Sequence, residues 1–240
     1  MVTYQQHSFF LDGKPYMILA GEIHYFRLDP STWESHLLTL KETGLNTVST
    51  YVPWLYHQEL EDRFDVVGIY SEYLNLVRFL ELAQKHGIFV FLRPGPFIMA
   101  EMKNEGIPYW VYEKHPYTIP LTWDQKSVPT PTLDYLHPSF LHEVSLWFKS
   151  LYNHISPFFQ QHGGPIIGIQ LDNEVGMLSW VSNAPDLTDD VKQMIHKAGF
   201  SPDQSIFTPS EAGALQLREI LGRIMRDRFH TYIQKLKEIW

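Results

Sequence analysis

The stretch Gly164-Pro165-Ile166-Ile167-Gly168-Ile169-Gln170-Leu171 is an apolar run that ends directly before Asp172-Asn173-Glu174. A nearly continuous apolar run of this length is typical of a parallel strand that is buried on both faces. Such strands present their functional side chains at their carboxyl ends. The stretch therefore predicts a buried parallel strand, and it makes Glu174 the first catalytic candidate.

Upstream of this strand the chain alternates between strand and helix patterns. Two helix patterns, one from Pro30 and one from about Glu72, carry apolar residues on one face and stop at Gly44 and Gly87, as helices commonly do. An apolar run follows each of them. The predicted strands are residues 8–11, 16–19, 45–52, 88–92 and 165–171, and the predicted helices are residues 30–43, 72–86, 138–161 and 210–240.

This alternation predicts an α/β fold with a parallel sheet, either doubly wound or closed into a (β/α)8 TIM barrel. No glycine-rich phosphate-binding motif follows any strand, and polar or aromatic residues follow all of them instead, as in a barrel. Only four core strands are counted, and residues after Met177 look like an excursion. We therefore expect the first four or five βα units of a barrel, with residues 1–240 as the N-terminal portion of a catalytic domain.

Charge and composition exclude several classes of partner and of catalytic site. The formal net charge is −8 with no cluster of Lys and Arg, which argues against nucleic acid or an anionic membrane as partner. The chain has no Cys, so thiol nucleophiles and Cys-based zinc sites are excluded. Its first residues lack the pattern of a signal peptide, and a cytoplasmic enzyme is expected. Aromatic residues make up 15% of the chain, and such rings can stack on the apolar faces of sugars.

The residues at the predicted strand ends suggest glycosidase chemistry. A Glu with a raised pKa can protonate a leaving-group oxygen, and an Asn beside it can orient a sugar hydroxyl. Other interpretations stay open for the remaining residues: Tyr51 and Trp54 could be core or rim aromatics, and Arg93 could pair with Glu174 or Glu22. His24 beside Glu22 is too small a set for a metal site, so we expect no metal and no cofactor.

Four motifs, taken in order, resemble glycoside hydrolase family 35, the β-galactosidases. They are Gly21-Glu22-Ile23-His24-Tyr25-Phe26-Arg27, Thr50-Tyr51-Val52-Pro53-Trp54, Leu92-Arg93-Pro94-Gly95-Pro96-Phe97-Ile98-Met99-Ala100-Glu101, and Gly163-Gly164-Pro165-Ile166-Ile167 through Asn173-Glu174. The resemblance covers about residues 7 to 180. It implies a β-galactoside substrate, with Glu174 as acid/base, galactose hydroxyls held by Tyr51, Glu101 and Asn173, and backbone groups from Met99 and Ala100. Around these residues we expect supporting roles for Glu22, Trp54 and Arg93.

The chain departs from the family pattern in two ways. Val175 stands where the family commonly has Tyr, and the family draws its nucleophilic Glu from a late strand of the barrel. Retention of configuration needs two carboxyl groups about 5 to 5.5 Å apart, and the only stand-ins here are Glu22, Glu101 and Glu211. We therefore expect a fragment of a longer enzyme, inactive alone.

Two rival functions stay open, and the incomplete barrel also predicts self-association. A non-catalytic sugar-binding half barrel and a metal-dependent hydrolase are the rival functions. A half barrel with open sheet edges is also expected to dimerise, as a homo-oligomer, or to aggregate.

Overall fold

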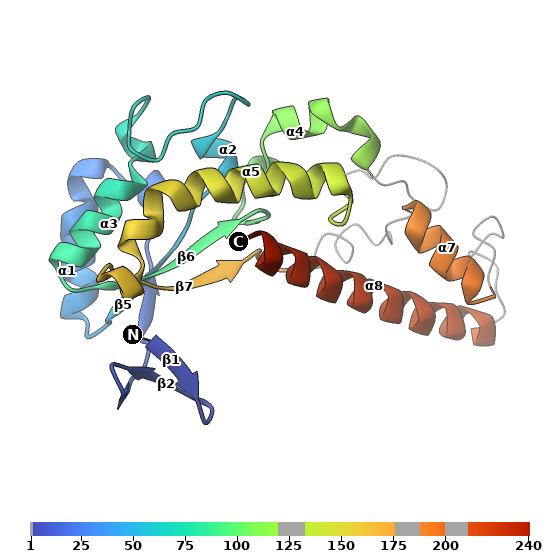
Figure 1. Cartoon of the computed structure of the whole chain (residues 1–240), viewed down its shortest axis with the longest axis horizontal. Coiled ribbons are helices and arrows are strands. Elements are labelled where there is room, and N and C mark those ends of the chain that lie inside the picture. The colour runs from blue at the N-terminus through green and yellow to red at the C-terminus, as the bar shows by residue number, and fades with distance from the viewer. Residues whose placement is uncertain (1, 120–132, 176–187, 200–210) are drawn as a thin grey trace. The chain divides into compact units, whose positions relative to one another are not determined.

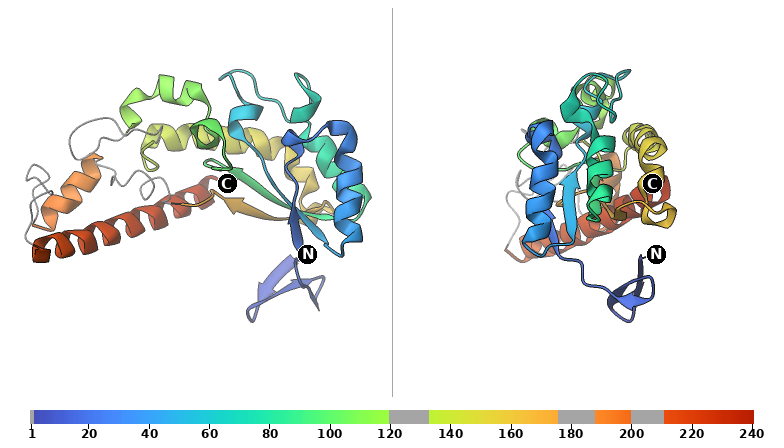
Figure 2. Two further views of the ribbon diagram at one scale, coloured as in Figure 1. Left: turned by 180° about the vertical axis from the view of Figure 1, so that it is seen from behind. Right: turned by 90° about the vertical axis from the view of Figure 1, so that its left-hand side faces the viewer.

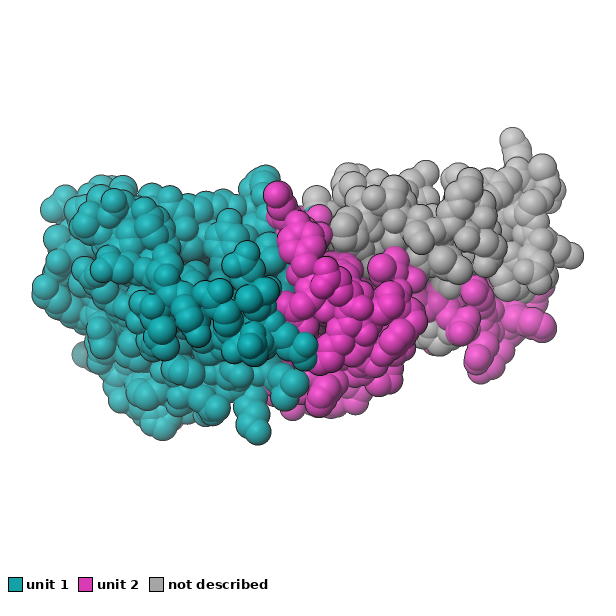
Figure 3. All heavy atoms as spheres, turned by 90° about the horizontal axis from the view of Figure 1, so that it is seen from above, with its two compact units in different colours: residues 1–102, 106–108, 146–173 teal, residues 103–105, 109–145, 174–240 magenta. Residues whose placement is uncertain are grey.

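The computed structural model describes residues 2–119, 133–175, 188–199 and 211–240, which form two compact units. The first unit comprises residues 1–102, 106–108 and 146–173, and the second comprises residues 103–105, 109–145 and 174–240. Figure 3 colours the two units separately. Each unit is described by itself below.

A parallel sheet of four strands forms the centre of the first unit (Figure 1). The strands are β4 (Ala20–Glu22), β5 (Thr47–Tyr51), β6 (Phe89–Gly95) and β7 (Ile166–Leu171), and they pair in chain order. Val48 lies opposite Val90 and Leu92 lies opposite Ile169. The parallel sheet of the predicted α/β class is confirmed.

Amphipathic helices connect the strands of the first unit. α1 (Trp33–Glu42) and α3 (Leu76–Lys85) contact each other, and α3 also contacts β6; Figure 2 shows these helices from two further sides. α2 (Trp54–His57) follows β5, and the carboxyl-terminal part of α5 (Pro138–Ile155) belongs to this unit. The predicted helices at residues 30–43, 72–86 and 138–161 correspond to α1, α3 and α5. Short 3₁₀ turns flank them: η1 (Tyr25–Arg27), η2 (Pro30–Thr32), η3 (Glu72–Leu74), η6 (Ser156–Phe158) and η7 (Gln160–His162).

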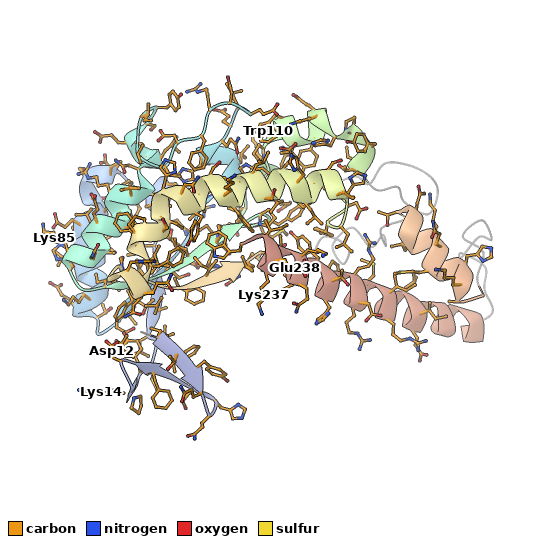
Figure 4. The ribbon with its side chains drawn as sticks, viewed as in Figure 1. Asp12, Lys14, Lys85, Trp110, Lys237 and Glu238 are labelled. Carbon is orange, nitrogen blue, oxygen red and sulfur yellow. The ribbon has the colours of Figure 1, made fainter. Side chains whose placement is uncertain are left out.

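A small antiparallel sheet precedes the core of the first unit. It contains β1 (Val2–Gln5), β2 (Ser8–Leu11) and β3 (Lys14–Pro15). Figure 4 labels Asp12, in the turn between β2 and β3, and Lys14, the first residue of β3. The strand predicted at residues 16–19 is wrong, since β3 ends earlier and β4 begins at Ala20. The side chain of Asn46 explains the difference. It accepts from the Leu19 amide at 3.0 Å and donates to the Met17 carbonyl at 2.8 Å, which occupies backbone groups of this segment.

The second unit is mainly helical. It contains α4 (Tyr109–Lys114), the start of α5, α7 (Asp189–Lys197) and α8 (Glu211–Ile239), with the turn η5 (Pro116–Thr118). The turn η4 (Lys103–Gly106) lies at the boundary of the two units. α8 confirms the final helix that the sequence predicts over residues 210–240. The sequence pattern does not predict α7. α7 and α8 pack through a small apolar cluster formed by Val191, Ile195, Ile220, Leu221 and Ile224.

A buried ion pair ties α8 to the segment before α5. Arg228 is 4% exposed and donates to the Asp134 carboxylate at 2.7 Å. Tyr135 packs beside Phe229 and Tyr232, with ring centroids 5.8 and 5.2 Å away. Within the described ranges, none of the helices combines the length and the apolar character that crossing a bilayer requires.

Candidate active site

Side chains from four different strands meet at the carboxyl edge of the parallel sheet. Glu22 is the last residue of β4, Tyr51 the last of β5, Arg93 lies near the end of β6, and Asn173 follows β7. The register places Tyr51 directly opposite Arg93. Parallel strands in consecutive order bring their carboxyl ends to one edge, so residues far apart in the chain become neighbours.

Arg93 links the other three residues. Its guanidinium donates one hydrogen bond to the Glu22 carboxylate and another to the Asn173 side-chain oxygen, the latter at 2.6 Å. Its central carbon also lies 3.8 Å from the centroid of the Tyr51 ring, which is the geometry of a cation–π contact. Glu22 is one of the two carboxylates that the sequence left open as a partner for Arg93. The planar fork of Arg suits this multiple contact better than the single ammonium of Lys would.

The loop after β6 has a backbone conformation that L residues rarely adopt. Met99, Ala100 and Glu101 have φ angles of 56°, 50° and 48°, in the left-handed region where each non-glycine residue costs about 1 kcal/mol or more. Arg27 donates to the Ala100 carbonyl, and the Met102 amide donates to the Met99 carbonyl at 2.9 Å. These contacts hold the loop, and the Glu101 side chain is exposed.

Hydrogen bonds also hold the turn after β7, where the backbone again has a positive φ angle. Asp172 has a φ angle of 63° and is 3% exposed; its amide donates to the Gly95 carbonyl at 2.7 Å. Its carboxylate accepts from the Asn173 amide at 2.7 Å. Asp172 thus fixes the backbone that carries Asn173.

Glu174 begins the last segment of the second unit and has an exposed side chain. Glu105, in the same unit, has a raised carboxyl pKa. Burial is the larger cause, and the negative charge of Glu174 is the second cause. Glu105 is half-buried, although it lies in the hydrophilic stretch Lys103-Asn104-Glu105. Nothing in that hydrophilic pattern signals the burial.

Two further residues considered in the sequence, His24 and Trp54, follow β4 and β5. The His24 ring lies 5.1 Å from the Tyr51 ring, and burial, opposed by the charge of Glu22, lowers the pKa of His24. Trp54 is fully buried, stacks on Trp147 at 5.9 Å and donates to the Gln58 side chain at 2.9 Å. It is therefore a core aromatic. Among the described residues, no group of three or more His, Asp or Glu is arranged to hold a metal ion.

The family model for glycosyl hydrolases family 35 matches residues 8–216, which include every strand-end residue described above. The chain belongs to this family. Proteins similar to this chain include a beta-1,2-glucosyltransferase of Ignavibacterium album (38% identical over 78% of this chain), an exo-beta-D-glucosaminidase of Thermococcus kodakarensis (35% over 82%) and the beta-galactosidase of Homo sapiens (35% over 73%). The aligned part is 26%, 25% and 23% of those proteins, so the chain spans about a quarter of their length.

A solved structure gives the same fold. The crystal structure of beta-galactosidase from the psychrophilic Marinomonas ef1 superimposes with a TM-score of 0.67 and 13% sequence identity, covering 93% of this chain and 35% of that one. The predicted partial (β/α)8 barrel is confirmed by this match and by the four parallel strands.

Proposed function

We propose that the protein carrying this chain is a retaining β-galactosidase that removes terminal β-linked galactose from oligosaccharides or glycosides. Residues 1–240 form the N-terminal portion of its barrel domain in this proposal. The observation that supports it is the meeting of Glu22, Tyr51, Arg93 and Asn173 at one sheet edge, in a chain of family 35.

In the proposed mechanism Glu174 protonates the glycosidic oxygen as the bond to the anomeric carbon breaks. The same residue then removes a proton from the water that attacks the galactosyl-enzyme. Asn173, Tyr51 and Glu101 bind sugar hydroxyls, and the constrained backbone at Met99 and Ala100 adds carbonyl and amide groups.

The second carboxylate of a retaining pair is proposed to come from a further strand of the barrel. Glu22 is a poor nucleophile because its carboxylate is paired with the Arg93 guanidinium, and such pairing stabilises the anion and reduces its reactivity. Glu101 has no comparable partner among the described residues, but its exposed side chain sits on the loop after β6. We assign no nucleophile to residues 1–240.

The test is hydrolysis of aryl β-galactosides, β-glucosides and β-glucosaminides, together with lactose, by the wild type and by Glu174→Gln. Glu81→Gln, an exposed change on α3, is the matched control. We expect galactosides to be cleaved fastest and the Glu174 variant to lose cleavage of lactose, whose leaving group needs a proton. Full lactose cleavage by that variant would refute the assignment of Glu174, and a preference for another sugar would refute galactose.

Two relatives are named as a glucosaminidase and a glucosyltransferase, which is why the substrate series includes β-glucosides and β-glucosaminides. The rival function is a sugar-binding half barrel without catalysis, which Tyr51, Glu101 and Asn173 could still support. Sugar binding without any hydrolysis by the intact protein would favour that rival.

A further inference from the structure

The side-chain amide of Asn173 is held in one orientation. Its oxygen accepts from Arg93 at 2.6 Å and from the Gln170 amide nitrogen at 3.1 Å, while its nitrogen donates to the Ile98 carbonyl at 3.1 Å. A guanidinium can only donate and a carbonyl can only accept. Rotating the amide by half a turn would place donor against donor at Arg93 and acceptor against acceptor at Ile98. The chemistry of its partners therefore fixes which atom is oxygen.

This arrangement uses both acceptor positions of the Asn173 oxygen. An amide oxygen has two lone pairs and an amide nitrogen has two N–H donors. Two donors occupy the oxygen, and one N–H is used at Ile98. The second N–H has no partner among the residues that the structure describes. Toward a ligand, Asn173 can therefore donate a hydrogen bond but cannot readily accept one.

Gln170 takes part in this arrangement and has no role in the mechanism above. It lies half-buried on β7, and its amide nitrogen donates both to the Asn173 oxygen and to the Asp172 carbonyl at 3.0 Å. It thereby connects the amide of Asn173 to the backbone that carries it. Arg93 alone would leave one lone pair of that oxygen open.

We propose that Gln170 and Arg93 make Asn173 a hydrogen-bond donor only, so that the sugar group facing Asn173 must be an acceptor such as a hydroxyl and not a protonated amine. Gln170 is then a positioning residue that sets substrate specificity. The inference rests on the proposed function, because it takes Asn173 to contact the sugar. An ammonium group at the contacted ring position would place its N–H donors against the N–H of Asn173, close to the guanidinium of Arg93. The site selects neutral sugars over amino sugars.

The test compares binding of methyl β-D-galactoside with binding of its analogues that carry one amine in place of one hydroxyl, at each ring position in turn. Inhibition constants are measured on the intact protein on both sides of the pKa of the amine. At one ring position the protonated amine should bind about tenfold more weakly than the hydroxyl, or worse, since a donor is left unpaired. The loss should be reversed at a pH where the amine is neutral and can accept.

Two variants separate this specificity from a loss of folding. Asn173→Asp is nearly isosteric and replaces the N–H donor with an acceptor, so it should reverse the preference and favour the amine. Gln170→Leu should lower, several-fold, the ratio of the inhibition constant of the protonated amine analogue to that of the parent galactoside. Gln84→Leu, which removes an exposed amide that bonds the Gly163 carbonyl, should leave that ratio unchanged.

The outcomes distinguish the donor-only role of Asn173 from the proposed function of the protein. If the galactoside binds and every protonated amine analogue binds equally well, the donor-only assignment is overturned while the proposed function stands. An unchanged hydroxyl-to-amine ratio in Gln170→Leu would overturn the positioning role of Gln170. If the parent galactoside neither binds nor is cleaved, the proposed function fails, and this inference fails with it.

Discussion

His57 is fully buried in the first unit and should make its stability depend on pH. The Asp65 carbonyl lies 2.5 Å from Nδ1 and can only accept, so Nδ1 carries the proton and Nε2 accepts from the Tyr25 hydroxyl. Burial, opposed by the carbonyl and the charge of Asp65, lowers the pKa of His57 from 6.5 to about 4. The neutral ring is thus the form that the folded state accommodates.

The sign and size of the effect follow from proton linkage. Between pH 6.5 and about 4 the unfolded chain binds a proton at His57 that the folded chain excludes, so stability falls as the pH falls. With these two values, lowering the pH from 7 to 5 should cost about 2 kcal/mol of unfolding free energy from this residue alone. Asp65 stays ionised over this range, because backbone N–H groups that donate to its carboxylate outweigh its burial and lower its pKa.

The assay is urea denaturation at pH 7 and pH 5, followed by tryptophan fluorescence, since the Trp147 ring lies 6.4 Å from the His57 ring. His57→Asn keeps a donor for the Asp65 carbonyl but cannot titrate. Its stability should change between the two pH values by about 2 kcal/mol less than that of the wild type. The control is His162→Asn, at an exposed position, which should behave like the wild type. If the unfolding free energy of the His57 variant changed between pH 7 and pH 5 as much as that of the wild type, His57 would not be the source of the pH dependence.

Three further predictions concern the core, the charges and metals. Trp147→Ala removes a fully buried ring that donates to the Pro94 carbonyl at 3.1 Å. It should lower the unfolding free energy measured in urea by about 3 to 5 kcal/mol. The control Leu146→Ala, at an exposed position, should change that free energy by no more than about 0.5 kcal/mol, and equal losses would contradict the packing described. Glu174→Gln should lower the pKa of Glu105 in a carboxyl NMR titration, but only in part, because burial is the larger cause of the raised pKa; an unmoved titration would contradict their coupling. Dialysis against EDTA should leave galactoside hydrolysis unchanged, since the described residues offer no three-ligand cluster, and a loss restored by a divalent metal would favour the metal-dependent alternative.

Much of the fold could be predicted because local signals agree with the packing. Gly44 and Gly87 follow α1 and α3 with φ angles of 89° and 65°, a conformation that glycine adopts readily, and the apolar runs after them are β5 and β6. The segment 16–19 misled the prediction because its backbone is bonded by the side chain of Asn46, about 30 residues away. Hydrophobic pattern does not report such a contact.

The candidate site was predictable in position and not in detail. Residues at the ends of consecutive parallel strands must converge, which brings Glu22, Arg93 and Asn173 together. The contacts of Gln170 and the burial of Glu105 depend on register and on the loop conformation, and neither leaves a signal in the sequence. The catalytic and binding roles of the strand-end residues stay predictions, as does the cytoplasmic location.

Glu174 is proposed to act as the acid and base in galactoside cleavage, and the dependence of the cleavage rate on the leaving group is the sharpest test of this role. The measurement is the rate of the intact protein and of Glu174→Ala on aryl β-galactosides whose phenols span a wide range of pKa values, with and without azide. We expect the variant to lose most of its rate on poor leaving groups, to keep rapid bond cleavage on the best ones, and to form β-galactosyl azide. A uniform loss across the series, with no azide product, would contradict it.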